Sequence, residues 1–123
     1  MNRCLLFFLL AIILVPLSAN NAQSARFTGA YLLDVCEMDE NGNETVQGGH
    51  ATCQSYISGV VDYHNVLQAL RLAPKVDICV PQSKTMNDIH KVVLNFLRKH
   101  PEHDAFIAAP AVTMALFDVY PCK

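Results

Sequence analysis

The chain has 123 residues, of which 52% are hydrophobic, and its 9 basic and 11 acidic side chains give a net charge of −2. Nucleic-acid binding requires a positively charged surface, which this acidic balance does not favour, so we expect no nucleic-acid partner. A chain of this length folds as one domain with a modest hydrophobic core.

The first 19 residues have the composition of an export signal. A short basic start precedes about a dozen apolar residues, and small residues close the segment. The apolar run is shorter than the roughly 20 residues that span a bilayer. We therefore expect cleavage after Ala19, or alternatively after Ala22, with no stable membrane insertion afterwards. Residues 20–123 would then form the exported mature domain with a net charge of −3, and Cys4 would be removed.

The mature chain begins with one helix and a polar loop. The spacing of its apolar residues predicts a first helix over residues 28–38, with Thr28 as a suitable N-cap. Residues 39–49 are polar and rich in turn-forming residues, which predicts a loop.

The second predicted helix, over residues 51–72, is the longest. A stripe at helical spacing predicts its buried face. The stripe consists of Cys53, Tyr56, Ile57, Val60, His64 and Leu67. Gly59 interrupts this helix, at a cost of about 1 kcal/mol relative to alanine. We therefore expect another helix to pass close to Gly59, and we expect His64 to be a packed histidine.

Two more helices complete the chain. Thr85 followed by Asp88 resembles a capping box and starts a third helix that ends near residue 99. Residues 102–109 are expected to form a turn or a short helical piece. Pro110 suits the first turn of a last helix, which Pro121 terminates. The predicted fold class is all-α: a compact four-helix domain with room for one extra short helix.

Four cysteines remain after cleavage, namely Cys36, Cys53, Cys79 and Cys122. An even number in a short exported chain is typical of a disulfide framework. Four cysteines permit three connectivities. If consecutive helices form hairpins, the end of the first helix lies beside the start of the second, and the start of the third beside the end of the fourth. This geometry favours Cys36–Cys53 and Cys79–Cys122, two disulfides that staple the domain.

The other polar residues form no recognised catalytic pattern. The five histidines include no His-Glu-x-x-His pair, no Cys-x-x-Cys is present, and no serine lies in a Gly-x-Ser-x-Gly elbow. We therefore expect no catalytic residue, no metal site and no cofactor, and a protein that is not an enzyme.

Four segments in order resemble one family of proteins. They are GAYLLDVC at 29–36, CQSYISGVVD at 53–62, the Cys79-Val80-Pro81 connector with the helix that follows it to His100-Pro101-Glu102, and the end of the chain from Ala115-Leu116 to Tyr120-Pro121-Cys122. Together they are similar to the immunity proteins of type VI secretion amidase effectors, the Tai or resident-associated (Rap) family. The resemblance spans essentially the whole mature chain.

The resemblance implies a periplasmic, disulfide-bonded helical protein that acts by binding. Its partner would be a peptidoglycan-cleaving amidase of the NlpC/P60 type, delivered by a neighbouring cell, whose catalytic cysteine it would block. The resemblance also implies a homodimer.

An inhibitor of this kind needs exposed residues that reach into a groove. The polar turn at residues 99–104 is our preferred element because Pro101 stiffens it and it joins two helices tied at their far ends. The exposed side of the third helix, including Asn87 and Arg98, would flank the turn. An ordinary solvated turn is the alternative interpretation. The candidate partner-binding residues are Lys99, His100, Glu102, His103, Asp104, Lys91 and Asn95.

A second hypothesis is an orphan helical binding module without a toxin partner. It could carry a small lipophilic ligand, as the helical odorant-binding proteins of insects do, or act as a periplasmic stress chaperone. Odorant-binding proteins contain a Cys-x3-Cys pair, whereas no two mature cysteines here are closer than Cys36 and Cys53. This spacing counts against the carrier.

Overall fold

The computed structural model describes residues 26–73 and 75–122. In this part of the chain lie four α-helices and one short 3-10 helix: α2 (Gly29–Cys36), α3 (Gly49–Ala69), α4 (Met86–Lys99), η1 (Pro101–His103) and α5 (Ala108–Val119). Its extended residues form only isolated bridges, so the predicted all-α class with one extra short helix is confirmed. The predicted signal peptide, residues 1–19, lies outside the described residues. None of the described helices is long and apolar enough to cross a membrane.

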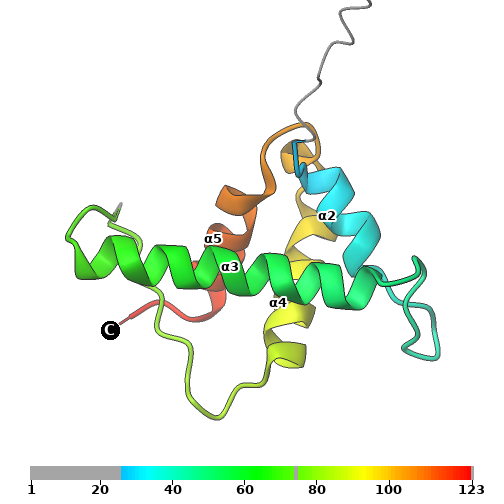
Figure 1. The fold of residues 1–123 in the computed structure, drawn as a ribbon, viewed down its shortest axis with the longest axis horizontal. Coiled ribbons are helices and arrows are strands. Elements are labelled where there is room, and N and C mark those ends of the chain that lie inside the picture. The colour runs from blue at the N-terminus through cyan, green and yellow to red at the C-terminus, as the bar shows by residue number, and fades with distance from the viewer. Residues whose placement is uncertain (1–25, 74, 123) are drawn as a thin grey trace, which may run out of the picture.

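The helices pack around one core. Figure 1 shows α4 and α5 running antiparallel and joined at one end through η1, with α3 lying across them and α2 beside α4. Each of the four α-helices contributes buried apolar side chains to the centre. The largest fully buried apolar ones are Leu32, Ile57, Leu97, Leu116, Val93 and Val112.

Two helices begin where the sequence predicts, because their caps are local. The Thr28 hydroxyl accepts a hydrogen bond from the Tyr31 amide at 3.3 Å and starts α2. Thr85 and Asp88 form a complete capping box at the start of α4. In this box the Thr85 hydroxyl accepts from the Asp88 amide, and the Asp88 carboxylate accepts from the Thr85 amide at 2.9 Å.

The other two helices begin two residues earlier than predicted, because groups outside each helix, Glu44 in the preceding loop and Phe27 far away in the sequence, accept from their first amides. The Glu44 carboxylate accepts from the amides of Gly48 and His50, so α3 starts at Gly49 rather than at residue 51. These two bonds lower the pKa of Glu44. The Ala108 amide donates to the Phe27 carbonyl at 2.9 Å, so α5 starts at Ala108 rather than at Pro110.

Both predicted disulfides are confirmed. Cys36–Cys53 links the end of α2 to the second turn of α3, and Cys79–Cys122 links the connector before α4 to the residues after α5. The sequence separations are 17 and 43 residues. In the chain-entropy treatment, loops of these lengths correspond to about 3 and about 4 kcal/mol of stabilisation.

The expectation that a helix passes close to Gly59 is wrong. A Cβ atom at Gly59 would meet no atom within 4 Å, because this side of α3 faces open space. The close contacts lie at two other glycines. A Cβ at Gly29 would lie 2.3 Å from the His103 carbonyl oxygen, and one at Gly49 would lie 2.7 Å from the Val35 carbonyl oxygen. Both positions admit only glycine without a backbone shift.

Alanine at two glycines should therefore change stability in opposite directions. Gly59→Ala should raise the free energy of unfolding by about 0.5–1 kcal/mol, because it improves helix propensity in open space. Gly29→Ala should lower it by about 1–3 kcal/mol, because the methyl group collides with backbone. Urea unfolding of the two variants measures both changes. A lower free energy of unfolding in Gly59→Ala, or an unchanged one in Gly29→Ala, would contradict the packing described above.

Candidate partner-binding surface

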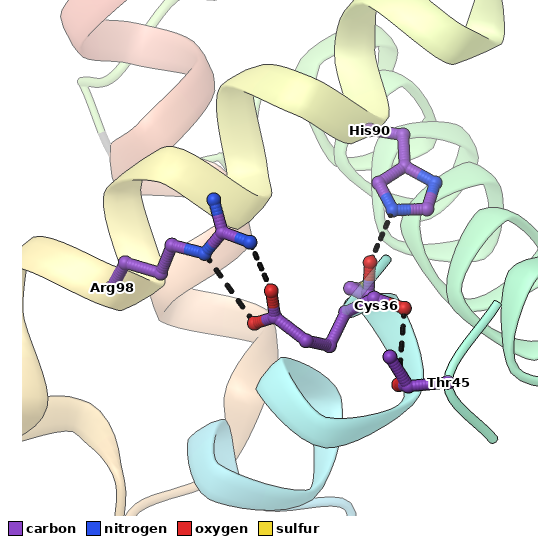
Figure 2. Close-up of polar contacts among 5 residues, drawn as sticks. Cys36, Thr45, His90 and Arg98 are labelled. Carbon is purple, nitrogen blue, oxygen red and sulfur yellow. Dashed lines mark hydrogen bonds and ion pairs between the residues drawn. The ribbon is translucent and has the colours of Figure 1, made fainter. Parts of the chain in front are cut away.

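The outer face of α4 supplies the first part of the predicted surface. Lys91, Asn95 and Lys99 are exposed along this helix. Arg98 is also exposed, but it forms an ion pair with Glu37 just after α2, as Figure 2 shows. The hydrogen bond from Arg98 to Glu37 raises the pKa of the guanidinium. Arg98 therefore ties α4 to the end of α2 and is less available to a partner than the two lysines.

The turn after α4 is ordered by side-chain contacts. The His100 ring stacks on Phe96 with ring centroids 4.1 Å apart. His100 Nδ1 donates to the Glu102 carboxylate at 2.7 Å, and this hydrogen bond lowers the pKa of Glu102. Glu102 lies in the 3-10 helix that begins at Pro101, and its side chain is exposed to solvent. The turn thus presents an ionised carboxylate on a stiff backbone.

The second half of the turn serves the fold instead. The Ala30 amide donates to the Asp104 carbonyl at 3.1 Å, and the Gly29 amide donates to the Phe106 carbonyl at 2.9 Å. These bonds satisfy donors at the start of α2 that have no partner within the helix. His103 and Asp104 are half-buried. The structure therefore divides the predicted residues into an exposed group on α4 and η1 and a packed pair beside α2.

A shallow depression of about 220 Å³ brings three of the predicted residues together. It lies between α4 and α5, and Asn95, Lys99 and His100 line it with Asp118. Lys91 and Glu102 are not among its lining residues. The depression carries both signs of charge over an apolar floor that includes Phe96.

An apolar groove between α3 and α5 was missed by the sequence analysis. Its volume is about 680 Å³. Tyr63 and Met114 are 65% and 47% exposed along it. It is lined by Ser55, Tyr56, Gly59, Val60, Tyr63, His64, Leu67, Val76, Ala109, Pro110, Thr113 and Met114. The C-terminal half of α3 extends past the helices behind it, as Figure 1 shows, so part of the apolar stripe remains uncovered.

The junction of α2, α3 and α4 holds a buried histidine that the sequence did not single out. His90 is 0% exposed, and its Nε2 donates to the Cys36 carbonyl at 2.8 Å, as Figure 2 shows. Its Nδ1 is buried without a partner. Burial lowers the pKa of His90, and the nearby His50 contributes to the same shift. A ring nitrogen of His90 and the sulfurs of Cys36 and Cys53 lie within 4.8 Å of one another.

Comparison with known families places the chain in one of them. The sequence model of a family described as Rap1a immunity proteins matches residues 28–122. The matched range includes the five helical elements and all four disulfide cysteines. No curated protein and no solved structure gives a significant match.

The burial of His90 predicts a loss of stability in acid. An unfolded histidine takes up a proton near pH 6.5, whereas the folded chain keeps His90 neutral to a lower pH. Stability should therefore fall as the pH drops below about 6.5, by up to about 1.4 kcal/mol per pH unit from this group. Unfolding measured between neutral and mildly acidic pH in the parent and in His90→Gln tests this, because glutamine does not titrate.

On acidification, the His90→Gln variant should lose less stability than the parent. The His103→Gln variant, which leaves His90 in place, should lose as much as the parent. If His90→Gln lost stability on acidification as steeply as the parent, the buried histidine would not be the cause.

Proposed function

We propose, from the chain's membership of the Rap1a immunity protein family, that it protects its own cell by binding a peptidoglycan-cleaving amidase of the NlpC/P60 type in the periplasm. Family membership supports an immunity protein against a secreted effector. The resemblance to immunity proteins of type VI secretion amidase effectors supports the amidase, and two disulfides suit an oxidising compartment. The single observation that carries the proposal is the family match over residues 28–122.

The protein would act by occlusion, without catalysis of its own. In this proposal the exposed edge of α4 and η1 enters the amidase groove and covers its catalytic cysteine. The edge combines Lys91, Asn95 and Lys99 with His100 and Glu102. The stacked His100 and the 3-10 geometry fix the turn before binding, which reduces the entropy lost in the complex. The charged groups on this edge favour a polar partner surface of complementary charge.

The second part of the proposal is a homodimer formed through the α3–α5 groove. Homodimer interfaces are more apolar than other protein surfaces, and a large exposed apolar patch marks an interaction site. The groove combines both properties, since its lining residues include no aspartate, glutamate, lysine or arginine. A second copy of the chain is therefore its occupant in this proposal. The dimer would leave the charged edge of α4 free for the amidase.

Charge reversal on α4 should weaken inhibition of the proposed partner, a cognate NlpC/P60-type amidase. A Lys91→Glu/Lys99→Glu variant should raise the inhibition constant by about tenfold or more, because it places negative charge where the partner meets positive charge. Lys75→Glu/Lys84→Glu is the matched control, since it makes the same charge change at exposed lysines between α3 and α4. The control should inhibit as the parent does.

If the parent protein neither binds nor inhibits that amidase, and cells that export both proteins lyse as readily as cells that export the amidase alone, the immunity proposal fails. If the parent inhibits and both double variants inhibit equally well, the function holds and the α4 interface is wrong.

A charge in the groove should separate the dimer. Met114→Glu should give a monomer by analytical ultracentrifugation, whereas the parent should sediment as a dimer. Val46→Glu, which alters an exposed apolar residue between α2 and α3, is the control and should remain dimeric. A monomeric parent would overturn the dimer. If that monomer also bound a fluorescent lipophilic probe and Met114→Glu did not, the groove would favour the alternative function, carriage of a small lipophilic ligand.

A further inference from the structure

The junction of α2, α3 and α4 gathers three groups with the chemistry of zinc ligands. Cys36 ends α2, Cys53 lies in the first turns of α3, and His90 comes from α4. All three are fully buried. One ring nitrogen of His90 and the two sulfurs lie within 4.8 Å of one another. Thiolate and imidazole are the ligands of structural zinc sites.

His90 already has the hydrogen bonding of a metal-bound histidine. Metal-ligating imidazoles usually donate their other ring N–H to a carbonyl or carboxylate, which fixes the tautomer. Here Nε2 donates to the Cys36 carbonyl, so the lone pair of the neutral ring lies on Nδ1. Nδ1 is buried without a partner. Buried polar atoms are nearly always hydrogen-bonded, and this exception is independent of the distances within the cluster.

His50, outside this cluster, is a candidate for a fourth ligand. His50 lies three residues before Cys53 on the same face of α3, and its ring centroid is 5.2 Å from that of His90. His50 is only half-buried, so solvent reaches this side of the junction. Either His50 or a water molecule entering from this side can complete a tetrahedron.

We propose that the reduced form of the chain binds one zinc ion through Cys36, Cys53 and His90. In the oxidised protein the two sulfurs are bonded to each other and the site is closed. A dithiol reductant breaks this bond, supplying two electrons and two protons and becoming a disulfide itself. Zinc then displaces the two thiol protons to solvent and is held by two thiolates and the neutral imidazole.

The geometry needs only small movements. Tetrahedral zinc places its ligand atoms roughly 3.3–3.8 Å apart. The two bonded sulfurs must therefore separate, while the nitrogen already lies within 4.8 Å of both. The ion would replace the covalent link between α2 and α3 and would add α4 to it. In a newly made chain the cysteines have not yet been oxidised, so zinc could bind there before the disulfide forms.

The second disulfide supplies an internal control. Among the described residues, no histidine, aspartate or glutamate joins Cys79 and Cys122 within the same distance. Zinc should therefore bind at the Cys36 and Cys53 pair and not at the Cys79 and Cys122 pair. A Cys79→Ser/Cys122→Ser variant keeps the site, and a Cys36→Ser/Cys53→Ser variant removes it.

Cobalt(II), the spectroscopic substitute for zinc, tests the proposal. The full exported protein is reduced with a phosphine and titrated with cobalt under anaerobic conditions. The reduced Cys79→Ser/Cys122→Ser variant should bind one ion, with a thiolate-to-cobalt charge-transfer band that zinc abolishes. Adding His90→Gln should weaken binding by about tenfold or more, whereas adding His103→Gln should not. The oxidised parent and reduced Cys36→Ser/Cys53→Ser should give no band.

A thermal measurement keeps the test valid if reduction loosens the fold. Zinc should raise the melting temperature of the reduced Cys79→Ser/Cys122→Ser variant, or restore its helical signal, and it should do neither once His90→Gln is added. Absence of the charge-transfer band in this reduced variant would overturn the proposal. Equal affinity in the variants with and without His90, or equal binding by the two cysteine-pair variants, would also overturn it.

Discussion

The short helix α2 is the element on which the remaining packing depends, and it is held at both ends by groups far away in the sequence. Eight residues are too few for an isolated helix to be stable in water. At its start, the backbone of residues 103–106 lies directly against Gly29, and two of its carbonyls accept the free amides of the first turn. At its end, the disulfide to Cys53 and the hydrogen bond from His90 hold Cys36. Leu32 and Val35, between these two anchors, are then positioned to complete the core.

This arrangement gives the turn after α4 two different roles. Its Glu102 side chain is exposed and its His100 ring is half-buried against Phe96, while carbonyls of the turn cap α2. A partner that binds the outer side would therefore meet a surface braced by the core. His103 and Asp104 belong to the part of the turn that packs against α2, so they lie outside the most exposed part of the proposed interface. The apolar α3–α5 groove is a separate surface with a different chemistry, and the two surfaces are suited to different partners.

The sequence predicted the parts of the fold that depend on local spacing. The capping box at Thr85, the N-cap at Thr28 and the cysteines at helix ends all act within a few residues or follow from hairpin connectivity. Gly59 was misjudged because a glycine in an apolar stripe looks the same whether it faces a helix or an open groove. Whether Gly59 faces a helix or open space is decided by where α3 extends past its neighbours, and this depends on the lengths of three other helices. The cluster of Cys36, Cys53 and His90 was missed for a similar reason, because its members come from three separate segments with no motif spacing.

Immunity by occlusion requires that the exposed edge of α4 and η1 be covered in the complex. Hydrogen–deuterium exchange of the protein, alone and with the proposed cognate amidase, measures this directly. We expect slower exchange in the complex over residues 91–102, in α4 and η1, with little change in the loop at residues 39–48. Formation of no complex, or protection confined to segments other than α4 and η1, would contradict the account.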